Sequence, residues 1–226
     1  MNNIPVTCCI PVRNGAATLE RAAHSAHRAG CDFILAYDDH STDSTLLTIM
    51  ALWPNVRRIG SEDIKHHAGV NFARNYLISH AVDSLIIPLD VDDELLDIRP
   101  LVQAWQPGTW VYGDYVQREG LEETLIPGSP AGMLSRKELT GISFMFHKDD
   151  WLKVGGYDPD FAYCEDYAFQ CALTHAGIQP VYVPTPVYRR HLKANGNERT
   201  SRAGEYWNFY HLMARRKYPS VFAVNR

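Results

Sequence analysis

The first part of the chain alternates between short apolar runs and longer segments in which apolar residues recur at helical spacing. The apolar runs, which predict strands, lie at residues 6–12, 33–37, 56–59 and 85–89. Apolar residues recur at the helical period over 19–29, 46–53 and 70–81, and this spacing predicts helices. The β-α-β-α-β-α-β order predicts an α/β fold, with a mostly parallel central sheet flanked by helices and a ligand outside the carboxyl ends of the strands.

The simple alternation stops after Pro100. Further strands are predicted at 110–116, 142–146 and 181–183, and further helices at 148–154, 166–176 and 206–217. Residues 120–141 are rich in Gly, Pro and Ser, and they predict a long loop. Because the sequence shows no internal repeat and no low-complexity run, we expect a single domain over residues 1–226.

The composition excludes several classes of protein. Hydrophobic residues make up 46% of the 226 residues and charged residues 21%, which excludes a disordered chain and a coiled coil. No apolar run approaches the roughly 18 residues that cross a bilayer. The N-terminus lacks the basic and apolar regions of a signal peptide, and the five cysteines form no C-x-x-C pair. We therefore expect a cytoplasmic protein with neither a disulfide framework nor a thiolate zinc site.

The net charge of −4 is unevenly distributed along the chain. Residues 189–226 contain nine Lys and Arg against two Glu, a balance of +7, so the residues before them sum to −11. Such a basic C-terminal segment fits a phosphorylated ligand, a polyanionic acceptor or the solvated face of an amphipathic helix. The pI of about 6.2 for the whole chain disfavours a nucleic-acid binder.

Acidic side chains directly follow the second and the fourth predicted strands. They are Asp38, Asp39, Asp90, Asp92 and Asp93. Carboxylates gathered at neighbouring strand ends repel one another unless a cation or hydrogen-bond donors lie between them. Carboxylate oxygens suit Mg²⁺ or Mn²⁺, and Mg²⁺ is commonly shared with substrate phosphates. We therefore expect a metal-phosphate site, with helix capping and a solvated acidic turn as the alternatives.

Seven short motifs follow one another along the chain. They are PVRN at 11–14, DDHSTDST at 38–45, GVNFARN at 69–75, LDVDD at 89–93, GGYD at 155–158, the pair ED at 165–166 and YRRH at 188–191. In this order they resemble the nucleotide-sugar glycosyltransferases of family 2, which have the GT-A fold. The resemblance implies a nucleotide-sugar-binding half over 1–99 and an acceptor-binding and catalytic half over 100–226. Pro88 departs from the pattern, because proline cannot donate within a central strand, and the strand is expected to end or bulge there.

The resemblance also implies which residues bind the donor. Family members bind the nucleotide diphosphate at positions that are here Pro11, Val12, Asn14, Asp38, Asp39, Arg74, Asp90, Val91 and Asp92. Either Asp38 or Asp39 is expected to accept from the base or the ribose, and Arg74 to bind phosphate or uracil oxygens. Three residues are expected to hold Mn²⁺ or Mg²⁺ against the diphosphate and so neutralise the leaving group: Asp92, Asp93 and His191.

The resemblance further implies that Asp166 is the catalytic base of an inverting transfer. Such a transfer is one in-line displacement, so a carboxylate takes the proton of the acceptor hydroxyl on the face opposite the departing diphosphate. Glu165 is expected to be a neighbour or helper, and not to share that role, because consecutive helical residues point about 100° apart. The alternative is an acidic pair that only complements a helix dipole.

These residues together predict a metal-dependent inverting hexosyltransferase. A UDP-sugar is the expected donor, by the habit of the family, and a saccharide or a lipid-linked sugar is the expected acceptor. Three alternatives remain open: transfer to a hydroxymethylated base in DNA, a non-catalytic relative that binds nucleotide sugars or glycans, and a nucleotidyltransferase or phosphohydrolase. The last class commonly has a Gly-rich phosphate loop, which the sequence lacks between Val12 and Leu19. Peripheral contact with a membrane and the oligomeric state also remain open.

Overall fold

The computed structural model describes residues 4–60, 67–131, 134–135, 137, 140, 142–192 and 198–223. Its first part contains β1 (Val6–Val12), α1 (Leu19–Ala29), β2 (Phe33–Asp38), α2 (Thr45–Ala51), β3 (Arg57–Ile59), α3 (Val70–His80) and β4 (Leu85–Pro88). The predicted alternation is therefore confirmed, with bounds that differ by a few residues at most. α2 is the least accurate prediction, because it begins at Thr45 and ends before Trp53.

The second part is less regular. It contains β5 (Glu94–Leu95), α4 (Arg99–Ala104), β6 (Thr109–Glu119), β7 (Glu122–Ile126), β8 (Phe144–His147), α5 (Lys148–Val154), α6 (Glu165–His175), β9 (Gln179–His191), α7 (Glu198–Lys217) and α8 (Pro219–Phe222). No helix within the described ranges is both long enough and apolar enough to cross a bilayer.

Two expectations for the second part are wrong. The predicted loop at 120–141 contains β7, which pairs antiparallel with β6 as a hairpin. β9 extends over thirteen residues, whereas only 181–183 was predicted. Its prolines at 180, 184 and 186 hide the strand in the sequence, but a long parallel pairing with β6 tolerates them because its register shifts at Gly113 and Asp114.

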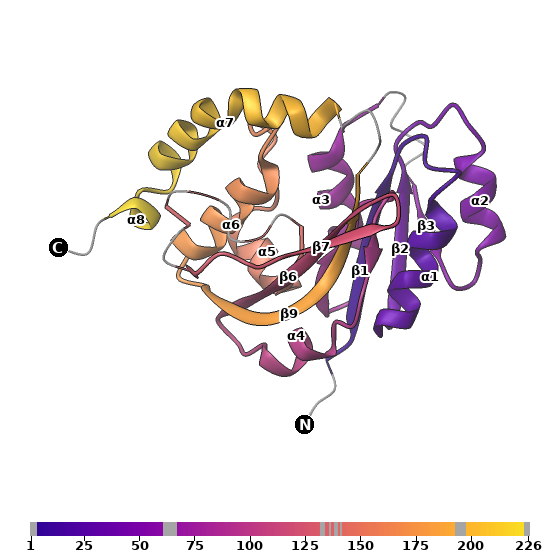
Figure 1. Cartoon of the computed structure of the whole chain (residues 1–226), viewed down its shortest axis with the longest axis horizontal. Coiled ribbons are helices and arrows are strands. Elements are labelled where there is room, and N and C mark those ends of the chain that lie inside the picture. Colours follow the sequence, from indigo (N-terminus) through magenta and orange to yellow (C-terminus); the bar gives the residue numbers. More distant parts are fainter. Residues whose placement is uncertain are drawn as a thin grey trace.

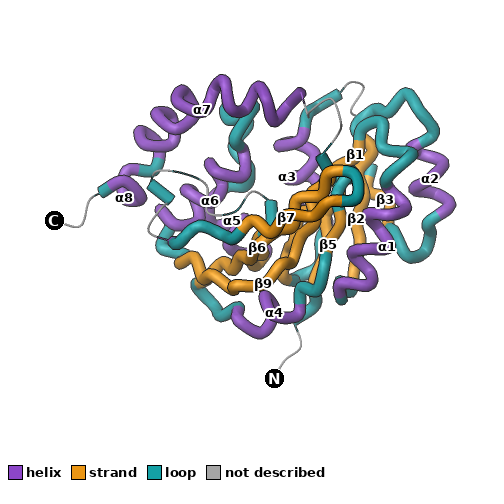
Figure 2. Tube along the Cα trace, in the orientation of Figure 1, coloured by secondary structure: helices purple, strands orange, loops and turns teal. Residues whose placement is uncertain are grey.

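One sheet runs through both parts of the chain. Among the described residues the strand order is β3-β2-β1-β4-β8-β6-β9-β5, with β7 beside β6 (Figure 1, Figure 2). The four strands β3, β2, β1 and β4 are parallel, as expected, and β8 then pairs antiparallel with β4. The chain leaves β1 toward β2 and β3 and returns to β4 on the other side of β1. This reversal opens a crevice at the carboxyl ends of β1 and β4, where α/β proteins bind their ligands.

β4 ends at Pro88, which agrees with the expectation that proline would stop this strand. The next residue, Leu89, still donates its N–H to the carbonyl of Cys9 at 3.0 Å. The acidic turn that follows is thereby fixed to the centre of the sheet, even though the regular strand has ended.

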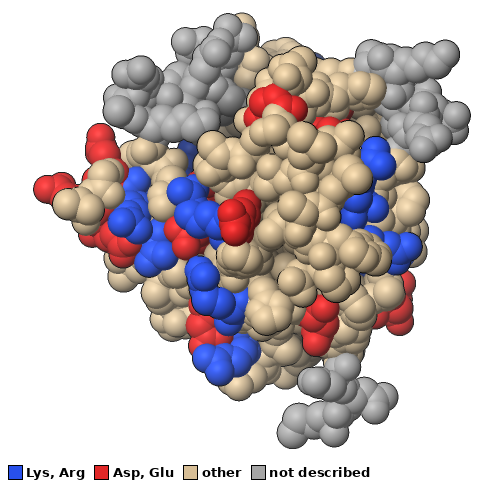
Figure 3. Space-filling model, turned by 90° about the vertical axis from the view of Figure 1, so that its right-hand side faces the viewer, with Lys and Arg blue, Asp and Glu red and all other residues tan. Residues whose placement is uncertain are grey.

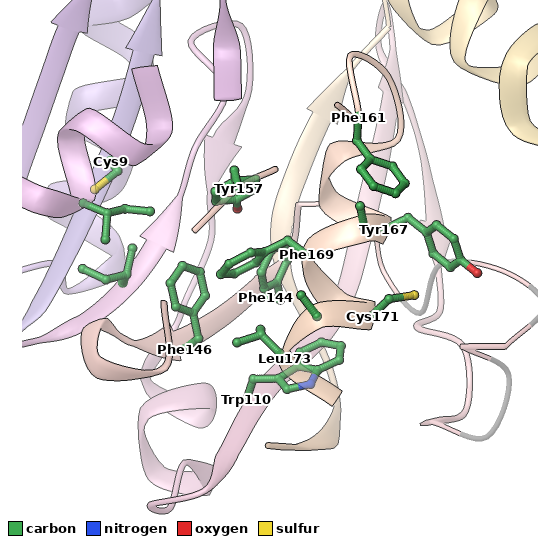
Figure 4. Close-up of a cluster of buried hydrophobic side chains, with 14 of the residues drawn as sticks. Cys9, Trp110, Phe144, Phe146, Tyr157, Phe161, Tyr167, Phe169, Cys171 and Leu173 are labelled. Carbon is green, nitrogen blue, oxygen red and sulfur yellow. The ribbon is translucent and has the colours of Figure 1, made fainter. Parts of the chain in front are cut away.

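Side chains of β1 alternate between two cores, because successive strand residues point to opposite faces. Cys8 and Ile10 pack with Ala22 and Ala26 of α1. Cys9 belongs to the second core, on the face that α3, α5 and α6 cover. This second core is rich in aromatic rings, of which Figure 4 shows Phe144, Phe146, Tyr157, Phe169 and Trp110.

Candidate active site

A cavity of about 530 Å³ lies at the predicted end of the sheet. Its walls come from the ends of β1 and β4, from α3, from the start of α6 and from β9. Nine of the residues expected to form the site line it: Pro11, Val12, Asp39, Asp90, Val91, Asp92, Asp93, Glu165 and Asp166. Segments separated by more than 150 residues in the sequence are therefore brought to one cavity, which a chance gathering of motif residues would not produce.

Asn14 and Asp38 are not lining residues, and they hold the loop beside the cavity. The side-chain carbonyl of Asn14 accepts from the backbone N–H of Thr42 at 2.8 Å, and Asp38 accepts from the N–H of Ser41 at 3.1 Å. The backbone N–H of Asn14 in turn donates to the Ser41 hydroxyl at 2.8 Å. The two residues therefore order the loop after β2, and Asn14 ties this loop to the end of β1. Neither residue caps α2, whose N-cap is Ser44 and has no side-chain cap hydrogen bond.

Arg74 lies beneath the cavity floor and connects three carboxylates. Its side chain is 2% exposed. Nη1 donates to Asp166 at 2.8 Å and to Glu165 at 3.2 Å, and Nη2 donates to Asp90 at 3.1 Å. Arg74 was expected to contact the nucleotide, and its nitrogens instead hold acidic groups that do line the cavity. One guanidinium thus joins the end of β4 to the start of α6.

The contact of Glu165 and Asp166 with the same nitrogen differs from the expected separation of the pair. Both carboxylates begin α6, and they are 11% and 17% exposed. Cys164, immediately before them, has a left-handed backbone with φ of 59°. At a helix end the side chains are less constrained than in mid-helix, so both carboxylates can turn toward the guanidinium of Arg74.

The aromatic core supports this charged centre from below. The ring of Tyr157 lies under Arg74, with 5.2 Å between the guanidinium carbon and the ring centroid. Tyr157 stacks on Phe169 of α6 at a centroid distance of 4.3 Å (Figure 4). The packing fixes α6 against α3, so the acidic pair and Arg74 keep their relative positions.

Asn75, the residue after Arg74, fixes the GGYD motif to α3. Its Nδ2 donates to the carbonyl of Tyr157 at 2.7 Å, while its Oδ1 accepts from the Tyr157 N–H at 2.7 Å and from Trp151 Nε1 at 2.9 Å. Gly156 passes so close that a Cβ there would lie 2.6 Å from Asn75 Oδ1. The motif is therefore a structural clamp beside the site.

We expect Gly156→Ala to lower the free energy of unfolding by about 2 to 4 kcal/mol, because it combines a left-handed backbone with overpacking. Gly177→Ala is the matched control. Both glycines have positive φ, 82° and 87°, but a Cβ at Gly177 meets nothing within 4 Å. That variant should lose only about 1 to 2 kcal/mol, the cost of the left-handed backbone alone. Chemical denaturation of both variants measures the difference, and equal losses would contradict the clamp.

The acidic turn after β4 is held in place by hydrogen bonds. The hydroxyl of Tyr188 donates to Asp93 Oδ2 at 2.9 Å and accepts from the backbone N–H of Asp90 at 3.2 Å. Burial raises the pKa of Asp93 to about 7, and the charge of Asp90 adds to the rise. Asp90, Asp92 and Asp93 carry oxygens of the kind that Mg²⁺ and Mn²⁺ prefer, and both oxygens of Asp93 already accept hydrogen bonds, from Tyr188 and from the backbone N–H of His191.

The side chain of His191 is not in the cavity. Its Nε2 lies 2.7 Å from Glu94 Oε1, although its backbone N–H donates to Asp93 at 2.8 Å. The reason is the alternation of β9: Tyr188 and Arg190 line the cavity, so the residues between and after them point to the other face. This geometry places Arg190, and not the expected His191 imidazole, beside the carboxylates.

Part of the basic C-terminal segment is neutralised on the opposite face of β9. Arg189 lies 3.6 Å from Glu94, which also has Arg21 and Arg28 within 4 Å. On the face drawn in Figure 3, many Lys and Arg side chains lie next to Asp and Glu. Lys193 and the side chains of Arg199 and Arg202 lie outside the described residues. Arg189 belongs to the basic C-terminal segment, but it is paired with an acidic side chain and does not add to a free basic surface.

A second group of His and Asp residues lies at the other end of the sheet. Asp83, His147 and Asp149 have ligand atoms within 4.8 Å of one another, whereas those of Asp92, Asp93 and His191 do not form such a set in the described part of the chain. His147 already caps α5 by accepting from the Asp149 N–H at 3.3 Å. Helix capping accounts for the contact of His147 with Asp149, and Asp83 is an exposed carboxylate 3.2 Å from His147 Nε2.

Several lining residues were not predicted. Arg13, His67, Tyr115, Cys164, Ser143 and Arg190 are among them. Arg13 lies inside the PVRN motif, so its place at a strand end could have indicated it. The sequence holds no signal that would pair His67 with a carboxylate 28 positions earlier.

Comparisons with known proteins give a family match and a fold match. The family model described as Glycosyl transferase family 2 matches residues 7–168, well over half of the chain. The match includes Asp166 and ends before the YRRH motif. A comparison with curated protein sequences found no match.

Solved structures of TarS from S. aureus share the fold. TarS 1–349 in complex with UDP-GlcNAc aligns with a TM-score of 0.68 and 14% identity over 88% of this chain and 61% of that one. The longer TarS structure aligns with a TM-score of 0.66 and 13% identity over 84% of this chain and 37% of that one. This chain thus spans less than two thirds of the TarS chains. At such identity the likeness shows the fold alone, and the expected GT-A fold is confirmed.

Proposed function

Because this chain belongs to glycosyl transferase family 2, we propose that it is a metal-dependent inverting glycosyltransferase. It transfers a sugar from a nucleotide diphosphate, with a UDP-sugar as the leading candidate, to a hydroxyl acceptor. A saccharide or a lipid-linked sugar is the acceptor class that we favour. TarS has been solved with UDP and with UDP-GlcNAc, which supports uridine nucleotides as the first donors to test.

The observation that carries the proposal is the gathering of carboxylates from three segments in one cavity. Asp39, Asp90, Asp92, Asp93, Glu165 and Asp166 line it, against the two guanidinium groups of Arg13 and Arg190. A diphosphate anion would be repelled by such walls without a cation. A Mn²⁺ or Mg²⁺ ion, when bound, neutralises the leaving diphosphate.

Different residues of the chain are proposed to bind the cation and the departing phosphate. Asp92 and Asp93 are proposed to hold the cation, and the turn between β4 and β5 presents them. Arg190 faces the same cavity and supplies positive charge that could stabilise the departing phosphate. His191 is not included, because its imidazole contacts Glu94.

Asp166 is proposed as the base that takes the proton of the acceptor hydroxyl. Its contact with Arg74 at 2.8 Å keeps the carboxylate oriented. Glu165 shares Arg74 and is proposed to help hold that guanidinium. Because Arg74 also contacts Asp90, the proposed base and the proposed metal turn keep a fixed separation.

A donor screen tests the function. The full chain is mixed with Mn²⁺ and with UDP-glucose, UDP-galactose, UDP-N-acetylglucosamine or GDP-mannose, and the released nucleotide is identified. Slow release of a nucleoside diphosphate supports a transferase, because water replaces the acceptor. Release of a monophosphate, or no release from any bound donor, would contradict the proposal.

The metal role predicts a specific loss of binding. Asp92→Asn should weaken UDP binding in the presence of Mn²⁺ by at least about tenfold, because a metal ligand loses its charge. Isothermal titration calorimetry with and without EDTA measures this effect. Asp97→Asn is the control. Asp97 lies five residues after Asp92, is exposed, and is paired with Arg99. If UDP affinity is unchanged by EDTA, the metal role is wrong.

A further inference from the structure

Helix α1 packs against the segment that contains the acidic turn and β5 (Figure 2). Two side chains one helical turn apart on α1, those of Arg21 and Ser25, contact the backbone of this segment. Arg21 Nη2 donates to the carbonyl of Asp92 at 2.5 Å, and the Ser25 hydroxyl accepts from the N–H of Leu95 at 3.0 Å. Because Ser25 is fully buried, α1 and the start of β5 keep one relative position, and Arg21 stays next to the turn.

The peptide between Asp92 and Asp93 is held at both of its polar atoms. Its N–H, which belongs to Asp93, donates to the carbonyl of Asp90 at 3.0 Å and closes the turn. Its carbonyl, which belongs to Asp92, accepts from Arg21. Rotation of this peptide would break both hydrogen bonds, and the bond from the charged guanidinium is the stronger kind. It would also redirect both aspartate side chains, because both α-carbons belong to the peptide plane.

The direction of the Asp92 side chain depends on this peptide more than that of Asp93 does. The carboxylate of Asp93 is held from β9, by the Tyr188 hydroxyl at 2.9 Å and by the backbone N–H of His191 at 2.8 Å. Those two bonds do not involve α1. Asp92 lines the cavity, and Arg21 contacts its own carbonyl. Loss of Arg21 should therefore affect the position of Asp92 first.

The charge of Arg21 does not by itself favour a cation at the turn. Its side chain is 40% exposed, and its Nε lies 3.7 Å from Glu94 Oε1. A positive group close to the carboxylates repels an approaching divalent cation, although solvent and Glu94 reduce the repulsion. A positioning role and a charge effect thus have opposite signs, which an experiment can separate.

We propose that Arg21 is a positioning residue of the acidic turn. Its guanidinium fixes the peptide that joins Asp92 to Asp93 and thereby directs the Asp92 carboxylate into the cavity. Within the described residues Arg21 is not part of the cavity wall, so it acts through the turn and not by touching a ligand. The inference rests on the proposed function, because it concerns the turn that is proposed to hold the cation.

Calorimetric titration of UDP at a series of Mn²⁺ concentrations tests the proposal without a sugar or an acceptor. The UDP affinity of the wild-type chain should rise with Mn²⁺, and the Mn²⁺ concentration at half of this rise is the readout. Arg21→Met should increase that concentration at least about tenfold, because Asp92 is no longer directed toward the cavity. The UDP affinity in EDTA should stay within about twofold. A charge effect alone would lower the Mn²⁺ concentration.

Arg28→Met is the matched control. Arg28 lies on the same helix, and its Nη2 is 3.8 Å from Glu94 Oε2, so this variant removes an equal charge beside the same carboxylate. It leaves the bond from Arg21 to Asp92 in place. The Mn²⁺ requirement should stay within about twofold of wild type. A rise as large as that of Arg21→Met would overturn the proposal, because the loss of a neighbour of Glu94 would then be sufficient.

A double-mutant cycle adds a readout that a general loss of stability would not move. If Arg21 acts through Asp92, then Arg21→Met should change the Mn²⁺ requirement by less than about twofold in the Asp92→Asn background. Independent effects that multiply in the double variant would overturn the proposal. Circular dichroism establishes that each variant is folded.

The remaining contradicting outcomes separate this inference from the proposed function. If the wild-type chain binds UDP equally well with Mn²⁺ and with EDTA, the metal role and this inference are both overturned. If wild-type binding depends on Mn²⁺ but Arg21→Met has an unchanged or lowered Mn²⁺ requirement, only the positioning role of Arg21 is overturned.

Discussion

Asp166→Asn should lower the rate of sugar transfer by about 10²- to 10⁴-fold while leaving donor affinity within about twofold. The amide cannot accept the proton of the acceptor hydroxyl, but its Oδ1 can still accept from Arg74 Nη1, which lies 2.8 Å from the carboxylate in the native chain. Loss of rate without loss of donor binding is the signature of a base. Transfer assays and donor titrations on the same preparation measure both quantities.

Asp160→Asn is the matched control, because it removes the charge of an exposed aspartate six residues earlier. It should transfer sugar at the wild-type rate. Near-normal transfer by Asp166→Asn would show that another group takes the proton. A large loss of donor affinity would instead indicate that Asp166 mainly holds Arg74 and the metal turn in place.

Arg74→Ala should lower the free energy of unfolding by about 3 to 5 kcal/mol, the largest effect on stability expected for a residue of the site. Arg74 is 1% exposed and contacts Asp90, Glu165 and Asp166, so its removal leaves three carboxylates facing one another around a cavity. It also removes the cation above the Tyr157 ring. Denaturant titration measures the loss.

Arg99→Ala is the control for Arg74→Ala. Arg99 also forms a close ion pair, 2.7 Å from Asp97, but its side chain is 76% exposed, so solvent screens the interaction. We expect no measurable change in the free energy of unfolding. If the two variants lose similar stability, Arg74 is not the centre that holds the acidic residues together.

The elements of the first half could be predicted because their patterns are local. Gly30 and Pro88 mark where α1 and β4 end, and the apolar periods give the helices between them. The placement of Asp39, Asp90 and Asp92 at one cavity also follows from the order of the strands, since parallel strands end at the same edge. The sequence therefore predicted which distant residues meet only where strands and helices alternate regularly.

The contacts of Arg74 and His191 could not be predicted in the same way. Arg74 is bonded to residues 91 and 92 positions away, and nothing in the helix that carries it indicates that it is buried. For His191 the motif gave a position in the chain but no strand, because β9 was predicted only at 181–183, so the direction of its imidazole could not be derived. A resemblance transfers positions along a chain more reliably than the direction in which a side chain points.

The acidic turn between β4 and β5 is attached at both of its ends. β4 lies at the centre of the sheet, β5 pairs with β9 at its far edge, and Arg21 Nη2 donates to the carbonyl of Asp92 at 2.5 Å. A turn tethered in this way has little freedom left to lose. The entropy cost of ordering this turn is therefore met when the chain folds, and not when a ligand enters the cavity.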